Sequence, residues 1–179
     1  MNRLGSTVAA VLLMLSSFLF GAGPRHRIKA VYCTQITHGV WHLQGFKPLI
    51  NPNAATVFAE ISFAGKTVEA VRLRQFHTDY EVAFEYKFDA SGKLSSLLGN
   101  IVMLGRWVSE ANLFPDPDGT VRNFRVKYYK AGTEFQIARP QDAEYYTAEF
   151  DKVPVYRTIE SLPCAGSLED AEKMNATQE

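Results

Sequence analysis

Apolar and polar side chains alternate along most of the chain after its first two dozen residues. The clearest case is residues 80–88, YEVAFEYKF, where apolar or aromatic residues hold every second position and charged residues or alanine lie between them. Successive side chains of a strand point to opposite faces, so this pattern predicts a strand with one buried and one solvated face. The DASGK sequence at residues 89–93 then predicts a turn, with Gly92 free to take a positive φ.

Similar segments run through the rest of the chain and predict further strands. They are residues 28–36, 39–43, 55–63, 67–75, 100–108, 121–129, 133–139, 144–150 and 153–159. Residues 100–108 are apolar on both faces, which predicts a central strand with Gly105 as a bulge. Residues 112–119, NLFPDPDG, predict a loop rich in Pro and Asp. We expect an all-β fold, an antiparallel β-sandwich or barrel of about eight to ten short strands.

The N-terminus has the pattern of a signal peptide. Arg3 precedes the apolar segment TVAAVLLMLSSFLF at residues 7–20, and the small residues GAG follow it. We expect a signal peptide at residues 1–23, a single β-rich domain at residues 24–166 and a flexible C-terminal tail at residues 167–179. An uncleaved membrane anchor is the alternative, because residues 7–23 are near the lower length limit for crossing a bilayer. If the segment is cleaved, we expect no stable membrane insertion.

The two cysteines fit an exported protein. Cys33 lies near the start of the expected mature chain and Cys164 near the end of its domain. An even number of cysteines in an exported chain predicts a disulfide, and secreted or periplasmic compartments are those in which disulfides persist. Neither residue belongs to a CxxC motif, so redox catalysis is not indicated.

Charge and motif content narrow the classes of function. Nineteen basic and nineteen acidic residues give a formal net charge of zero, so there is no electrostatic case for a nucleic-acid partner. His38 and His42 are weak metal candidates, because no third ligand accompanies them. We therefore expect no metal and no cofactor. Neither a nucleophile motif nor a catalytic histidine can be identified, and an enzyme is the less favoured class.

A candidate binding surface comes from charged and aromatic residues expected on the solvated faces of strands. Arg72 and Arg74 share one face of a strand, and Arg125 and Lys127 share a face of another. In the doublets at residues 128–129 and 145–146, a strand would expose one tyrosine of each pair, which adds Tyr129 and Tyr145 to the surface. The alternative is ordinary surface charge and tyrosines that are buried on both sides.

These observations favour an exported, non-catalytic β-domain that binds protein or carbohydrate at the cell envelope or outside the cell. Two alternatives stay open. One is a barrel, lipocalin-like in architecture only, that carries a small apolar ligand in a cavity lined by Phe84, Tyr86, Phe124 and Tyr128. The other is a small hydrolase whose strand carboxylates face each other in a cleft, one of them with a raised pKa.

Overall fold

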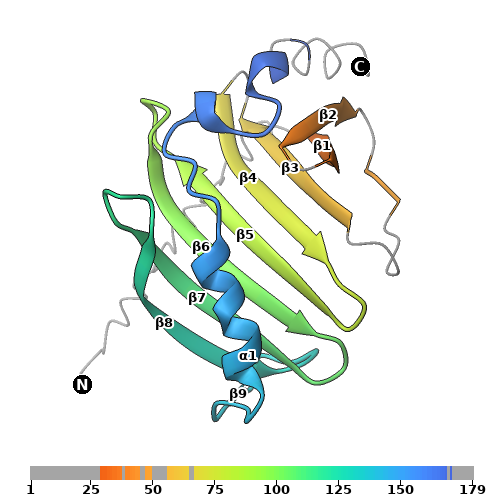
Figure 1. Ribbon diagram of the computed structural model, residues 1–179, viewed down its shortest axis with the longest axis vertical. Coiled ribbons are helices and arrows are strands. Elements are labelled where there is room, and N and C mark those ends of the chain that lie inside the picture. The colour runs from red at the N-terminus through yellow and green to blue at the C-terminus, as the bar shows by residue number, and fades with distance from the viewer. Residues whose placement is uncertain are drawn as a thin grey trace, which may run out of the picture.

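The structure is a computed structural model that describes residues 29–37, 39–44, 47–49, 56–64, 67–168 and 170. Over these residues the chain forms one antiparallel sheet of nine strands, in the order β2-β1-β3-β4-β5-β6-β7-β8-β9 (Figure 1). The strands are β1 (Lys29–Thr37), β2 (Val40–Gln44), β3 (Thr56–Ala64), β4 (Thr67–Phe76), β5 (Tyr80–Phe88), β6 (Leu94–Met103), β7 (Trp107–Pro115), β8 (Val121–Lys130) and β9 (Gln136–Ile137). The expected all-β antiparallel class is confirmed.

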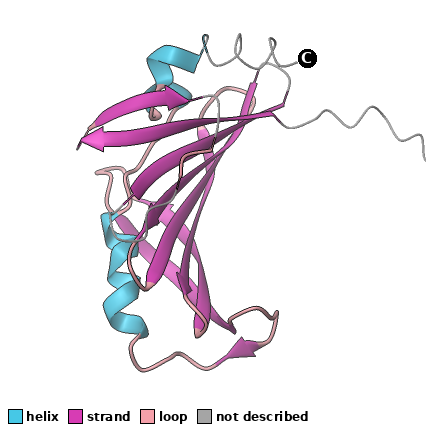
Figure 2. Cartoon of the chain, turned by 90° about the vertical axis from the view of Figure 1, so that its right-hand side faces the viewer, coloured by secondary structure: helices cyan, strands magenta, loops and turns pink. Residues whose placement is uncertain are grey.

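The sheet is open in the described part of the chain, with β2 and β9 at its edges. It is strongly curved, and a C-terminal segment of short helices crosses one side of it (Figures 1 and 2). Those helices are α1 (Ala143–Thr147), η1 (Ala148–Lys152), η2 (Ile159–Ser161) and η3 (Ala165–Ser167), the last three being 3-10 helices. We call residues 143–168 the C-terminal segment, the side it covers the inner face, and the opposite side the outer face. The segment covers the inner face as a second sheet would in a sandwich.

Because neighbouring strands pair in register, residues that face the same side of each strand line up in rows across the sheet. One row on the inner face runs through consecutive strand partners; its members are Ala59, Leu73, Phe84, Gly99, Ala111 and Val126. β5 begins and ends where the pattern predicts, and its inward-facing Val82, Phe84 and Tyr86 are buried. The charged residues at the alternate positions of β5 face outward. A register shift of one residue would exchange the two faces, so the alternating pattern specifies this register.

The main core lies between the inner face and the C-terminal segment. Phe150 is fully buried there, and its ring meets that of Phe84 edge to face with 6.3 Å between the centroids. The buried Tyr86 hydroxyl donates a hydrogen bond of 2.7 Å to the carbonyl oxygen of Pro154. Apolar contacts and a hydrogen bond therefore both hold the segment on the sheet.

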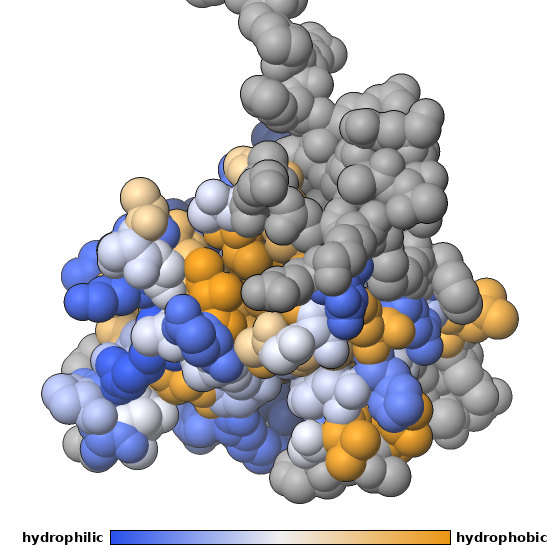
Figure 3. Space-filling view, turned by 90° about the horizontal axis from the view of Figure 1, so that it is seen from above, coloured by the Kyte–Doolittle hydropathy of each residue, from blue (hydrophilic) through white to orange (hydrophobic). Residues whose placement is uncertain are grey.

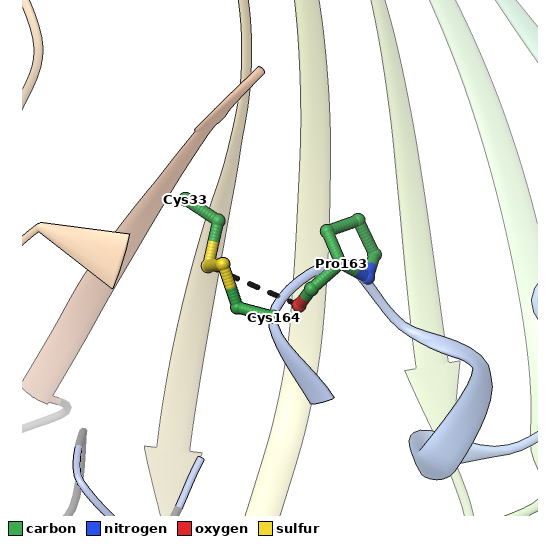
Figure 4. The surroundings of a disulfide bond; sticks show 3 residues. All are labelled: Cys33, Pro163 and Cys164. Atoms are coloured by element: carbon green, nitrogen blue, oxygen red, sulfur yellow. Dashed lines mark hydrogen bonds between the residues drawn. A yellow bond between two sulfur atoms is a disulfide. The ribbon is translucent and has the colours of Figure 1, made fainter. Parts of the chain in front are cut away.

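The expected disulfide between Cys33 and Cys164 is present and ties β1 to the C-terminal segment (Figure 4). The two Cα atoms are 6.3 Å apart although 131 positions separate the residues in sequence. Cys33 is completely buried, and its sulfur lies 3.8 Å from the carbonyl oxygen of Pro163. The bond closes nearly all of the described chain into one loop.

The single strand expected over residues 100–108 is wrong. β6 ends at Met103 and β7 begins at Trp107, so a tight turn occupies residues 104–106. Gly105 has a φ of +70°, the left-handed conformation that glycine adopts without strain, and Leu104 is exposed. Apolar residues on both sides of the turn made the two strand ends resemble one continuous strand. β7 also extends to Pro115, into the segment expected to be a loop.

The C-terminal strands expected at residues 144–150 and 153–159 are also wrong. The first is helical, in α1 and η1, and the second is extended but pairs with the sheet only through an isolated bridge between Thr158 and Lys93. Short apolar runs have no clear periodicity, so packing decides their conformation. Here Tyr146 and Phe150, four residues apart, lie on one helical face toward the sheet. Of residues 133–139 only β9 forms a strand.

The expected signal peptide and most of the expected tail lie outside the described residues. Both stay predictions. In the part of the chain that is described, we find no helix with the length and apolar character that crossing a membrane requires.

Candidate functional site

A cavity of about 420 Å³ lies between the inner face and the C-terminal segment. Strands β1 to β5 form its floor and one wall, and residues 149–156 form the other wall. Its lining residues are Gln35, Gly39, Trp41, Val57, Leu73, Gln75, Phe84, Glu149, Lys152, Pro154 and Tyr156. Apolar surface is visible between hydrophilic groups at the end of the molecule that carries β1, β2 and the 3-10 helices η2 and η3 (Figure 3).

The floor of the cavity is apolar. Val57, Leu73 and Phe84 come from β3, β4 and β5, and strand pairing places Leu73 directly beside Phe84. Trp41 on β2 and Tyr156 on the C-terminal segment add aromatic walls. Leu73 and Phe84 also belong to the core, so the cavity is a local gap in the packing between sheet and segment.

Two amide side chains stand beside this apolar floor. Gln75 is the strand partner of Val57, and Gln35 on β1 falls in the same cross-strand row, so the two amides flank β3 roughly 10 Å apart. Neither side chain makes a hydrogen bond to any residue that the structure describes. Each amide offers donors and an acceptor, so both are available to a ligand.

An ion pair lies on the helical wall of the cavity. Lys152 Nζ is 2.8 Å from Glu149 Oε1, with the lysine side chain mostly exposed and the glutamate mostly covered. The hydrogen bond to Glu149 raises the pKa of Lys152, and burial raises the pKa of Tyr156. At neutral pH the lysine is therefore charged and the tyrosine is a neutral hydrogen-bond donor.

Of the six residues expected to form a binding surface, five lie on the outer face. Arg72 and Arg74 lie on β4, and each is ion-paired: Arg72 with Glu85 at 2.5 Å and Arg74 with Glu81 at 2.6 Å. The hydrogen bond from Arg72 is the main cause that lowers the pKa of Glu85. Arg74 also lies over the rings of Phe58 and Phe76, which makes it a structural group on that face.

Arg125, Lys127 and Tyr129 alternate along β8 and share the outer face, as expected. Three strands separate them from Arg72 and Arg74, so the two basic pairs do not form one patch. The structure instead places Arg125 directly beside Asn112 of β7, and Lys127 directly beside Glu110 of the same strand.

Tyr145 is not part of this surface. It lies on α1, which packs on the inner face, and 76% of its surface is exposed. Its neighbour Tyr146 packs against Trp107 and Tyr80 instead. The interpretation of this doublet as part of a strand is wrong because the segment is helical, whereas the doublet at residues 128–129 lies in a strand and points its two rings to opposite faces.

The metal and hydrolase hypotheses gain no support from the described residues. His38 lies outside them, His42 is exposed on β2, and no described group of three His, Cys, Asp or Glu side chains is arranged to hold a metal. A general acid of a glycosidase requires a carboxyl group with a raised pKa. Glu85 has a lowered pKa instead, as do the exposed Asp89 and Glu160 through hydrogen bonds from nearby groups.

Comparisons of the chain with protein-family models, curated proteins and solved structures return no significant match. The site must therefore be interpreted from its own chemistry. Of the cavity residues, sequence reasoning named only Phe84. Gln75 was a sequence signal that could have pointed to the cavity. It follows Val71 and Leu73 at an inward-facing position of β4, so it interrupts a series of apolar residues.

Proposed function

We propose that the protein binds a small ligand with an apolar body and a polar group in the cavity between β1–β5 and the C-terminal segment. The observation that carries this proposal is the combination of an apolar floor at Val57, Leu73 and Phe84 with the two unengaged amides of Gln35 and Gln75. A cavity of about 420 Å³ falls within the range of roughly 300–1,000 Å³ that is typical of ligand pockets.

The cavity favours the small-ligand alternative over the two others. A packed interior would leave only the surfaces for recognition, whereas this interior has a gap lined by aromatic rings. Phe84 lines that gap as the small-ligand hypothesis expects, while Tyr86 is used for holding the C-terminal segment. Glu149, the carboxylate among the described lining residues, is paired with Lys152, and this pairing suits charge balance better than acid catalysis.

We further propose that the protein acts outside the cytoplasm. Support comes from the signal-like N-terminal sequence and from the disulfide between Cys33 and Cys164, since disulfides persist in oxidising compartments. A secreted or periplasmic carrier that picks up and releases its ligand without changing it is consistent with both features.

The test is a titration of the disulfide-bonded protein with a fluorescent long-chain fatty acid. We expect saturable binding of one molecule per chain. The Val57→Trp substitution fills the cavity and should weaken binding by roughly tenfold or more. Gln75→Leu should weaken binding less, because it removes one polar contact and leaves the apolar floor intact.

The matched control is Val126→Trp, which places the same bulk on the inner face near α1, away from the cavity. Affinity should be unchanged in this variant. Equal losses in both tryptophan variants, or no saturable binding of the fatty acid to the unaltered protein, would contradict the proposal.

A further inference from the structure

A second, chemically different depression lies on the outer face over β5 to β8. It has a volume of about 290 Å³ and is lined by Glu85, Leu98, Gly99, Asn100, Glu110, Ala111, Asn112, Arg125 and Lys127. Outward-facing residues of β6 and β7 form its floor, with Glu85 of β5 on one side and the two basic residues of β8 on the other. We call it the outer groove.

Strand register arranges the polar residues of the outer groove as a grid. Asn112 pairs with Leu98 on one side and Arg125 on the other, and Glu110 pairs with Asn100 and Lys127 in the next outward-facing row. Neighbours within a row are about 4.8 Å apart, and the rows are about 7 Å apart along the strands. Two amides, a carboxylate and two cations therefore point to the same side of the sheet, where one ligand can contact them together.

Most of these groups are free to bind. Asn100, Asn112, Arg125 and Lys127 make no side-chain hydrogen bond or ion pair in the part of the chain that the structure describes. The arginines of β4, by contrast, are neutralised by Glu85 and Glu81 on the same face. On the outer face, the positive charges of β4 are therefore neutralised by carboxylates, whereas those of Arg125 and Lys127 on β8 are unpaired among the described residues.

Aromatic rings flank the grid at both ends. Phe114 follows Asn112 on the same face of β7 with 57% of its surface exposed, and Tyr129 follows Lys127 on the same face of β8. From Phe114 to the position opposite Tyr129 is six residues along β7, or about 20 Å. Polar groups lying between two aromatic side chains about 20 Å apart fit an extended ligand made of several linked cyclic units better than a single compact molecule.

We propose that the outer groove binds an oligosaccharide that carries carboxylate groups. Sugar rings stack on exposed aromatic side chains, and their hydroxyls bond to amides and to the carboxylate of Glu110. Arg125 and Lys127 supply the charge complementarity for the acidic groups, the arginine through a bidentate pair. A nucleic acid is less favoured, because proteins that bind a phosphate backbone carry an excess of basic residues and the net charge of this chain is zero. The proposal is independent of ligand binding in the inner cavity.

The test is calorimetric titration of the full, disulfide-bonded protein with a tetramer of linked hexuronic acids. We expect saturable binding that weakens as salt is added, since exposed ion pairs are screened. The carboxyl-reduced, neutral tetramer should bind more weakly by roughly tenfold, and Arg125→Gln with Lys127→Gln should produce a similar loss with the acidic tetramer. Phe114→Ala should weaken both sugars, because it removes a stacking surface.

The charge-matched control is Lys130→Gln with Arg139→Gln, which removes two positive charges outside the groove; binding should be unchanged. Equal losses in both double variants, equal affinity for the neutral tetramer, or no saturable binding of the acidic one would each overturn the proposal. Tighter binding to vesicles containing anionic lipid, or to an acidic peptide, would overturn it as well. Val57→Trp should not affect this binding, so failure here is distinguishable from failure of the cavity proposal.

Discussion

The ring of Phe150 lies directly against Gly99 of β6. A Cβ atom on Gly99 would be 2.7 Å from Phe150 Cε1 and 3.0 Å from Leu113 Cδ1, closer than side chains pack. The glycine lets the C-terminal segment approach the sheet at this point. A glycine in the middle of a strand, which by itself weakens the strand, is thus explained by a close approach of another segment.

Gly99→Ala should destabilise the protein by about 1–3 kcal/mol, because the added methyl group forces Phe150 or Leu113 out of place. Thermal unfolding measures this as a lower Tm. Gly166→Ala is the matched control, since a Cβ there meets nothing within 4 Å and the backbone does not need a positive φ. Combining Gly99→Ala with Phe150→Leu should cost less than the sum of the two single substitutions; strict additivity would show that the contact is not the cause.

Tyr86→Phe should lower the free energy of unfolding by about 1 kcal/mol, because it removes the hydrogen bond to Pro154 and leaves that carbonyl without this donor. Urea denaturation measures the difference. Tyr156→Phe is the control: its hydroxyl makes no hydrogen bond among the described residues, so the change should be smaller. A larger effect at Tyr156 than at Tyr86 would contradict this account of how the segment is held.

Replacing both cysteines, Cys33→Ala with Cys164→Ala, should reduce the free energy of unfolding by up to roughly 5 kcal/mol, since the bond closes a loop of more than a hundred residues. Denaturant unfolding of the two proteins provides the comparison. Mass spectrometry without reductant should show the unaltered protein two hydrogens lighter than its thiol form. Identical unfolding midpoints would mean that the segment is held by packing alone.

Stability should fall as the pH rises from about 10 toward 12. Burial, followed by the nearby Glu149 carboxylate, raises the pKa of Tyr80 from 10.0 to about 12. The folded protein then holds this proton more tightly than the unfolded chain, so its contribution is complete below pH 10 and is lost as the pH passes the folded value. Tyr80→Phe should flatten the decline measured by urea denaturation across this window. An unchanged slope would assign the decline to other tyrosines such as Tyr86, whose pKa burial also raises.

The strands that could be predicted are those whose two faces have different surroundings. β5 matches its predicted bounds because apolar and charged side chains alternate throughout it, whereas the hairpin of β6 and β7 was hidden by apolar residues on both sides of Gly105. On the outer face, alternation correctly placed Arg125, Lys127 and Tyr129 together. It could not show that Arg72 and Arg74 are neutralised, because their partners lie on the neighbouring strand β5.

The sequence by itself determined the all-β class, the disulfide partners and which residues of most strands face inward, because these depend on local alternation and on there being only two cysteines. Tertiary structure decided the rest. Residues 143–152 are helical because Phe150 and Tyr146 make contacts with the sheet that no short sequence window contains. The inner cavity and the outer groove likewise exist only through register, which places Gln35, Val57 and Gln75 in one row across the sheet, and Asn100, Glu110 and Lys127 in another.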